Sequence, residues 1–224
     1  MSGSFWVWMK RRVKLQHKIV AIKSKGQKRP KRLIIFADKS VFEISEDVFV
    51  STALEVGQEI DDQYLAELVE KESYHNAFHA SLSLLNYRMR SKAELKRRLK
   101  EKEYNDSTIG QVLVKLVEKN FLDDEAFAKA FIKDKIRSRY LGPVTLRSEL
   151  FVHKLDKELV DKLLQQAYEE MPEEELVERL LEKRRIVKGK KLTQKERKRL
   201  LSYLQRRGHS WSVIKNAMEK WKLG

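Results

Sequence analysis

The stretch RMRSKAELKRRLKEKEYNDSTIGQVLVKLVEKNFLDDEAFAKAF, residues 88–131, decides the fold of this chain. It contains two short amphipathic helical patterns, a polar break, and a third pattern that begins at Asp123 and Asp124. Ser91 and Glu94 have the spacing of a capping box, in which a hydroxyl and a carboxylate bond the backbone N–H groups at a helix start. The stretch therefore predicts one three-helix unit and the beginning of a second.

The same apolar pattern recurs after shifts of 51 and then 54 residues. The matched sets are Leu95, Leu146 and Leu200; Leu99, Leu150 and Leu204; Tyr104, Leu155 and His209; Ile109, Val160 and Ile214; and Leu113, Leu164 and Met218. All helices share a 3.6-residue period, but leucine identity at two positions in all three copies favours a true repeat. Each unit is too thin to bury its apolar face alone, so the units are expected to stack into an elongated, curved array.

The part of the chain before these repeats predicts a small antiparallel sheet. β-Branched and aromatic residues dominate residues 13–22 and 32–45, with a tight turn at 37–39. Gly26 lies in the basic loop between them, which lacks the Gly-Lys-Ser/Thr ending of a phosphate-binding loop, so a hairpin tip is favoured. A helix is expected to begin at Asp61 or Asp62. The fold is thus expected to be mainly α, with a β-meander plus helix and then three three-helix repeats of helix-turn-helix type at residues 1–73, 74–122, 123–171 and 172–224.

The formal net charge of +15 is concentrated in two segments. Residues 10–32 hold 11 Lys or Arg and no acid, and residues 183–207 hold 12 with Glu196 as the one acid. The rest of the chain has 25 basic and 32 acidic residues. This asymmetry indicates a polyanionic partner, nucleic acid above all, or an acidic protein surface. The alternative is a pair of solvated lysine-rich faces without a partner.

Clusters of Lys and Arg attract phosphates by Coulomb energy and counterion release, without reading the bases. In the first repeat the candidate binding residues are Arg88, Arg90, Lys92, Lys96, Arg97 and Lys100. In the third repeat they are Arg184, Arg185, Lys188, Lys190, Lys191, Arg197, Lys198, Arg199, Arg206 and Arg207. Trp211 and Trp221 flank this last cluster and could stack on bases, although their helical spacing favours packing as core or end-cap residues.

The sequence predicts no catalytic site. His75 and His79 have the spacing of zinc ligands on one helix face, but Asn76 stands where a zincin has glutamate and the sequence shows no third ligand. Asp123 and Asp124 resemble a carboxylate pair, yet helix capping accounts for both. We therefore expect no enzyme activity, no bound metal and no cofactor.

The chain has no cysteine, which excludes disulfides and fits a reducing cytoplasm. No apolar run approaches the ~20 residues of a membrane span, and the N-terminal sequence does not have the pattern of a signal peptide. We expect a monomeric cytoplasmic protein with no membrane partner.

Short motifs also occur in a particular order across residues 77–221. They are RMRS with EL at 88–95, NFLDD with AFA at 120–128, RSR with GP at 137–143, EL at 149–150 and RGH at 207–209. As an ordered set they resemble the bacterial RecX family, modulators of the RecA recombinase. Glu103 and Lys154 stand where the family usually has glycine after the second helix of a unit, which leaves the geometry of these turns open.

The resemblance implies three tandem three-helix repeats, no catalysis, and binding to the RecA–DNA filament. Family members block or destabilise that filament, and lower its ATPase, strand-exchange and co-protease activities in recombination, DNA repair and the SOS response. The basic residues above, with Arg137 and Arg139, become candidate filament- or DNA-facing residues. Binding to single- or double-stranded DNA without RecA is expected to be weak. The alternatives are a sequence-tolerant DNA-binding protein of helix-turn-helix type and an α-solenoid scaffold for an acidic protein.

Overall fold

The computed structural model describes residues 17–26 and 30–223. It divides into two compact units. The first unit contains the chain up to residue 83 together with residues 99–112, and the second contains residues 84–98 and everything after residue 112. Among the described residues, no helix has the length and apolar character needed to cross a membrane.

The first unit contains a four-stranded antiparallel sheet of order β3-β2-β1-β4. The strands are β1 (His17–Lys25), β2 (Lys31–Phe36), β3 (Val41–Ser45) and β4 (Glu59–Ile60). The first three form the predicted meander, and Gly26 follows β1 in its hairpin connection to β2, as expected. The two-residue strand β4 pairs with the start of β1 and was not predicted, because two residues are too few to show alternation. Residues 13–16 of the expected first strand lie outside the described residues.

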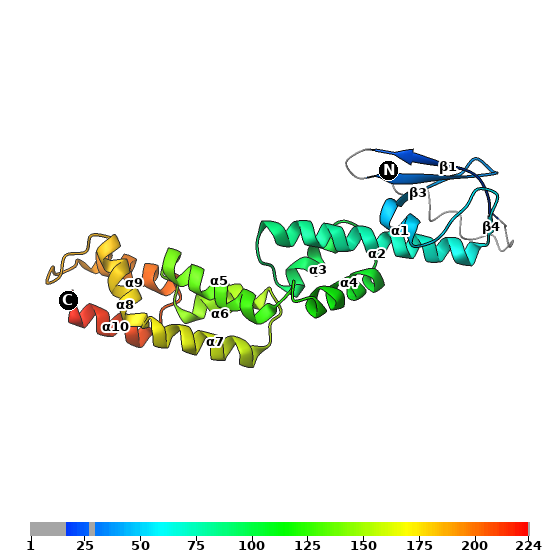
Figure 1. Ribbon diagram of the computed structural model, residues 1–224. Helices are drawn as coiled ribbons and strands as arrows, with labels where there is room; N and C mark the ends of the chain where they lie inside the picture. Colours follow the sequence, from blue (N-terminus) through cyan, green and yellow to red (C-terminus); the bar gives the residue numbers. More distant parts are fainter. Residues whose placement is uncertain (1–16, 27–29, 224) are drawn as a thin grey trace. The chain divides into compact units, whose positions relative to one another are not determined.

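Two helices complete this part of the first unit. The short α1 (Glu46–Val50) follows β3 directly, and α2 (Asp62–Tyr87) is 26 residues long. Figure 1 shows the sheet and α1 beside the N-terminal half of α2. Ile19, Ile34, Ile44 and Leu68 are fully buried between sheet and helix.

The long helix α2 differs from the expectation. The sequence predicted one helix from Asp61 or Asp62 and another from Tyr74, but the structure has a single helix through both. Asp61 accepts a hydrogen bond from the Tyr64 backbone N–H at 2.8 Å, so the predicted start is confirmed. No glycine or proline interrupts residues 62–87, so nothing ends the helix where a domain boundary was expected.

The C-terminal part of α2 is the first helix of the first predicted repeat. The helices that follow it in the described part of the chain carry the rest of the repeats, and they are α3 (Lys92–Lys100), α4 (Asp106–Glu118), α5 (Asp124–Arg139), α6 (Pro143–Phe151), α7 (Lys157–Glu170), α8 (Glu173–Lys183), α9 (Gln194–Arg206) and α10 (Trp211–Lys220). Helices α3 and α4 each contribute residues to both units. In the second unit one apolar cluster lies among α5, α6 and α7, and another among α8, α9 and α10. Figure 1 shows α5 beside α7 and α8 beside α10.

The repeat pattern also appears in the backbone. Positive φ angles occur at Glu103 (66°), Lys154 (52°) and Gly208 (86°), which keep the spacings of 51 and 54 residues. The left-handed turn after the second helix of each unit is therefore retained even where glycine is missing. The matched leucines of the pattern are at most 4% exposed in all three copies.

Candidate nucleic-acid and filament interface

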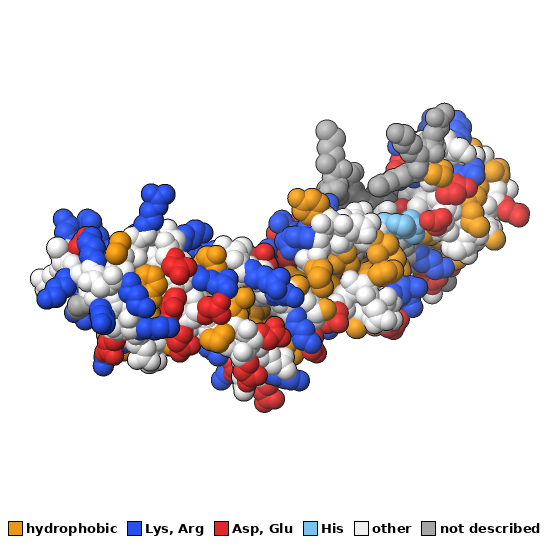
Figure 2. Space-filling view, turned by 60° about the vertical axis from the view of Figure 1, so that its left-hand side comes forward, with side chains coloured by type: hydrophobic (Ala, Val, Ile, Leu, Met, Phe, Trp, Pro, Cys, Tyr) orange, Lys and Arg blue, Asp and Glu red, His pale blue; other side chains and the backbone are white. Residues whose placement is uncertain are grey.

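A basic surface of the second unit covers the loop between α8 and α9 and continues along α9. Figure 2 shows Lys and Arg side chains gathered over this end of the unit. Two backbone hydrogen bonds hold the loop in place: Gly189 N–H donates to the Trp221 carbonyl at 2.8 Å, and Leu192 N–H donates to that of Leu223 at 3.3 Å. Because Trp221 and Leu223 are buried in the α8–α10 core, the basic loop is anchored to that core.

A hollow of about 260 Å³ lies between this loop and α9. Its charged lining residues are Arg184, Arg185, Lys190, Glu196 and Arg199. The apolar lining residues are Ile186, Val187, Leu192 and Leu200. Four cationic side chains and one carboxylate around one depression favour a small anionic group, such as a phosphate.

Glu196 is the acidic residue that lines this hollow, and it also caps the start of α9. The Thr193 backbone N–H donates to Glu196 Oε2 at 2.9 Å, which completes the predicted capping box of α9. Hydrogen bonds from the Thr193 backbone and hydroxyl, followed by the charge of Lys190, hold the pKa of Glu196 below its ordinary value. The carboxylate therefore stays ionised while it caps the helix.

Tyr203 lies between two arginines of the basic surface. The guanidinium carbon of Arg184 lies 4.2 Å from the Tyr203 ring centroid, and that of Arg207 lies 5.3 Å from it. Arg207 also donates a hydrogen bond to the Arg139 carbonyl at 2.8 Å, which places the end of α5 beside the end of α9. Sequence reasoning missed Tyr203, although its i, i+4 spacing to Arg207 on a helix was a usable signal.

The other predicted residues of the α5 end and the third repeat occupy exposed positions. Arg139 forms an ion pair with Glu149 at 3.0 Å, with about half of its side chain exposed. The other predicted site residues in this part of the chain are also exposed, namely Arg137, Lys188, Lys191, Arg197, Lys198 and Arg206. The expected core packing is confirmed for Trp221, which is 7% exposed, but not for Trp211, which is 56% exposed at the start of α10.

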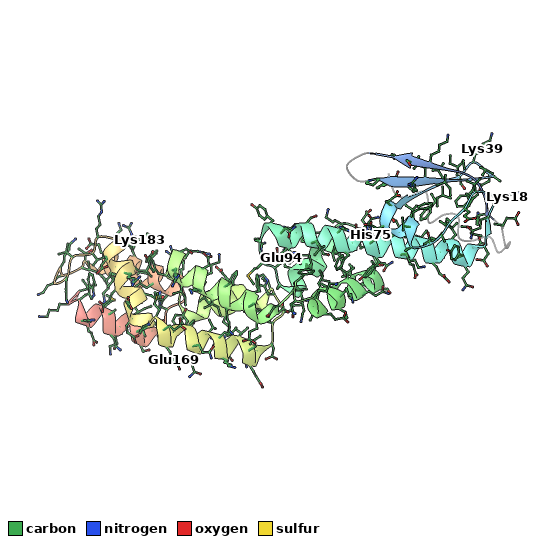
Figure 3. All side chains as sticks on the ribbon, viewed as in Figure 1. Lys18, Lys39, His75, Glu94, Glu169 and Lys183 are labelled. Atoms are coloured by element: carbon green, nitrogen blue, oxygen red, sulfur yellow. The ribbon has the colours of Figure 1, made fainter. Side chains whose placement is uncertain are left out.

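The basic residues around α3 divide into two groups. Lys92, Lys96 and Arg97 have exposed side chains in the second unit, whereas Lys100 belongs to the first unit and pairs there with Asp106. Figure 3 labels Glu94, the acid on α3 with which Arg88 and Arg90 form ion pairs.

Arg90 corrects the sequence prediction. It is 8% exposed, pairs with the Glu94 carboxylate, and donates through Nε to the Leu84 carbonyl at 3.1 Å. An arginine enclosed in this way cannot reach a phosphate, so Arg90 is structural. Arg88 pairs with the same carboxylate at 2.5 Å but keeps 49% of its side chain exposed. The basic pattern alone could not separate the two arginines.

The acidic pair at the start of α5 is a cap and a connection. Asp123 Oδ1 accepts hydrogen bonds from the backbone N–H groups of Glu125 at 2.8 Å and Ala126 at 3.0 Å, as predicted for an N-cap. Asp124 Oδ1 accepts from the Lys92 backbone N–H at 2.8 Å. Asp124 therefore connects the start of α5 to the start of α3.

Comparisons with known proteins give the family. Models of the first, second and third three-helix domains of RecX match residues 77–116, 123–164 and 172–218. Regulatory protein RecX of Bacillus subtilis is 34% identical over 202 residues, which cover 88% of this chain and 75% of that protein. Regulatory protein RecX of Oceanobacillus iheyensis is 28% identical over 179 residues, which cover 80% of this chain and 65% of that protein.

Solved structures are similar as well. A crystal structure of regulatory protein RecX superimposes with a TM-score of 0.67 and 25% identity, over 89% of this chain and 99% of that one. RecX from Lactobacillus salivarius shares the fold, with a TM-score of 0.52 and 16% identity, over 67% of this chain and 97% of that one. The family models together match more than half of the residues, and the chain therefore belongs to the RecX family.

Proposed function

We propose that this protein is a non-enzymatic regulator that binds the RecA–DNA filament in the bacterial cytoplasm and inhibits it. The observation that carries the proposal is the basic hollow beside α9, where Arg184, Arg185, Lys190 and Arg199 surround a space of about 260 Å³. The exposed Lys and Arg side chains of α3, α5 and α9 add further positive charge that can attract phosphates. Membership of the RecX family supports RecA as the partner, and hence a role in recombination and DNA repair.

The structure suggests how such a surface recognises its target. A phosphate in the hollow would meet arginine forks, which suit its planar pairs of oxygens. None of these contacts reads a base edge, so binding would follow the backbone of the DNA in the filament and not its sequence. The anchored loop limits the conformational entropy lost on binding.

RecA-dependent ATP hydrolysis on single-stranded DNA tests the proposal. We expect the protein to lower the hydrolysis rate at substoichiometric amounts. The double substitution Arg185→Glu and Arg199→Glu should raise the half-inhibitory concentration by about tenfold, equivalent to roughly 1.4 kcal/mol across the two contacts. Lys157→Glu with Lys162→Glu on α7 makes the same charge change at exposed positions outside the basic surface, and should leave inhibition unchanged. Unaltered ATPase and filament length at excess protein would refute the proposal.

A second candidate function is sequence-tolerant DNA binding without RecA. It is favoured by Trp211, which is 56% exposed at the start of α10, the helix that follows α9, and can stack on a base. Titration of single-stranded DNA at several salt concentrations separates the two functions. An autonomous DNA binder should show tight binding with a log–log salt slope of about −0.7 per phosphate contact. A filament regulator should bind bare DNA weakly and prefer the RecA-coated strand.

A further inference from the structure

Asp47 of α1 and two histidines of α2 form a cluster within the first unit. His75 and His79 lie one helical turn apart, with ring centroids separated by 4.4 Å. Asp47 Oδ2 lies 3.1 Å from His75 Nε2. One ligand atom from each of the three residues lies within 4.8 Å of the other two. The third ligand was invisible in the sequence, because Asp47 precedes His75 by 28 residues.

We propose that Asp47, His75 and His79 bind one divalent transition-metal ion of the zinc type. Two imidazoles and a carboxylate are the ligands that such ions take in open sites, with a fourth position left for water. Bonds of about 2.0–2.2 Å place neighbouring ligand atoms of a tetrahedral site about 3.4 Å apart. Asp47 Oδ2 and His75 Nε2, at 3.1 Å, are close to this separation, and the three ligand atoms, all within 4.8 Å of one another, can reach it by small side-chain movements.

The cluster can close around an ion at little structural cost. His75 is partly buried, with 21% of its side chain exposed, so α2 fixes the position of its ring. The Asp47 side chain is 77% exposed and His79 is exposed as well, so both can adjust their rotamers. The His79 ring also meets the edge of Phe78 at a centroid distance of 6.3 Å and an angle of 88°, which limits the directions that it samples.

The hydrogen bonding of His75 also fits coordination. Its Nδ1 is buried and, among the described residues, has no hydrogen-bond partner. The His75 Nε2 atom lies 3.1 Å from Asp47 Oδ2, and Asp47 belongs to the cluster itself. Neither ring nitrogen therefore has to break a bond to a residue outside the cluster when His75 coordinates an ion. Buried ring nitrogens are normally satisfied, so this histidine is unusual for a purely structural residue.

The surroundings favour a cation in a chain that is otherwise basic. Among the residues that the structure describes, a hollow of about 520 Å³ beside the cluster is lined by the carboxylates of Asp47, Glu67 and Glu70 and by the cation Lys71. Figure 2 shows histidine side chains at the surface of this unit, beside acidic and hydrophobic ones. Figure 3 labels His75 where α1 lies next to α2.

A bound ion would cross-link α1 to α2. Because α1 follows β3 without a break, the sheet would be held on the long helix by a coordinate link in addition to apolar contacts. Binding to the folded state alone stabilises a protein in proportion to the logarithm of ligand concentration, so the melting temperature of the first unit should rise with metal concentration. The site requires no RecA and no DNA, so its test is independent of the function proposed above.

Titration of the metal-free full chain with Co²⁺ and then Zn²⁺ tests this site. We expect one equivalent of Co²⁺ to produce visible d–d absorption, and Zn²⁺ to displace it. His79→Gln and Asp47→Asn each remove one ligand at an exposed position, and should weaken binding by at least about 100-fold, since loss of an outer-shell partner alone costs about 10–100-fold. Glu70→Gln removes a carboxylate from the same hollow without touching the cluster, and should change affinity by less than about threefold.

The outcomes are distinct. Thermal melts with chelator present establish that each variant folds like the parent chain. A parent chain that gives no Co²⁺ spectrum at one equivalent contradicts the proposal, and shows that the two histidine rings pack together without binding an ion. Binding that survives unchanged in His79→Gln also contradicts it, because the ion then lies elsewhere in the chain.

Discussion

The second unit contains two junctions between successive helical repeats, and they differ in what makes the contact. The first junction joins residues 88–94 to α5 and to the end of α6, and side chains make it. The second joins residues 140–145 to residues 206–209, and backbone atoms make most of it. The same repeat is therefore connected to its neighbours by two different chemistries.

The first junction is a polar network. The Glu94 carboxylate forms ion pairs with Arg88 and with the buried Arg90. Ser91 Oγ lies 2.8 Å from His153 Nδ1. The His153 ring packs against Phe127 at a centroid distance of 4.7 Å. Burial by itself raises the pKa of Glu94, but the hydrogen bonds and charges of Arg88 and Arg90 outweigh it and hold this pKa below its ordinary value.

The second junction is a close backbone approach. Gly142 N–H donates to the Arg207 carbonyl at 2.8 Å, and Val144 N–H donates to the Gly208 carbonyl at 3.1 Å. A Cβ on Gly142 would lie 2.3 Å from the Gly208 oxygen, so no larger residue fits. His209 adds contacts to the Tyr140 carbonyl at 3.0 Å and to Glu173 at 3.2 Å. The first junction should thus respond to charge and pH, and the second to side-chain size.

The largest effect should come from the buried ion pair of the first junction. Arg90→Ala leaves the enclosed Glu94 carboxylate with Arg88 alone, and removal of one member of a buried pair costs about 3–5 kcal/mol. We expect a loss near the lower end, about 3 kcal/mol, in the free energy of unfolding measured with urea. Arg88→Ala is the matched control, because its half-exposed side chain should contribute at most about 1 kcal/mol. Equal losses in the two variants would show that burial does not distinguish these arginines.

A smaller loss is expected at the second junction. Gly142→Ala forces the Gly208 backbone to move, and overpacking of this kind costs about 1–3 kcal/mol. Gly110→Ala in α4 is the control, because a Cβ there meets nothing within 4 Å, and alanine should stabilise the helix by about 0.5–1 kcal/mol. Urea denaturation of both variants gives the comparison. A Gly142→Ala chain as stable as the parent would mean that the close approach is not required.

Much of this fold could be predicted from sequence because its signals are local. Capping residues such as Asp123 and Thr193 act on backbone groups three residues away, and the leucine pattern repeats within single helices. The sequence analysis divided α2 into two helices, because it placed a second helix start at Tyr74 although no stop signal precedes that residue.

The candidate site was predictable only in part, because contacts across the fold leave no spacing in the sequence. The exposed basic residues of α9 followed from charge density, but burial of Arg90 depends on a carbonyl six residues earlier in the chain. The stacking of Arg184 on Tyr203 joins the residue that caps the end of α8 to α9, and no periodic pattern in the sequence predicts it. Asp47 is a similar case, since its approach to His75 depends on how α1 packs on α2.

The pH dependence of stability sharpens the contrast between the junctions. Burial is the main cause that lowers the pKa of His153 from its ordinary value of 6.5, against a smaller opposing effect of Glu94. The unfolded chain therefore binds the proton more tightly than the folded chain, so stability should fall as pH drops below about 6.5 until the folded pKa is passed. The lowered pKa of Glu94 adds a second loss, which begins as pH falls below its ordinary value of 4.5.

His153→Phe should remove the first of these two losses. Phenylalanine keeps the ring contacts with Phe127 and Phe131 but cannot titrate. Urea midpoints measured between about pH 7 and pH 5 should then be nearly constant in the variant while they decline in the parent. His79→Gln, measured with chelator present, is the control and should keep the parental decline. If His153→Phe keeps it too, the first junction is not the pH-sensitive one.

The smallest effect concerns the left-handed turn that follows the second helix of a repeat and occurs at an equivalent position near each junction. Lys154 and Gly208 occupy equivalent left-handed positions, with φ angles of 52° and 86°. A Cβ on Gly208 would lie 2.3 Å from the Thr145 nitrogen, whereas Lys154 carries its Cβ in the corresponding turn and bears only the strain of its φ angle. Lys154→Gly should therefore stabilise the chain by about 0.5–1 kcal/mol, because glycine adopts positive φ without steric cost. Lys157→Gly in the first turn of α7 should destabilise it by a similar amount, since φ there is helical. A loss of stability in Lys154→Gly would mean that the lysine side chain makes a contact that outweighs its backbone strain, and the difference between the two turns would then not be one of size alone.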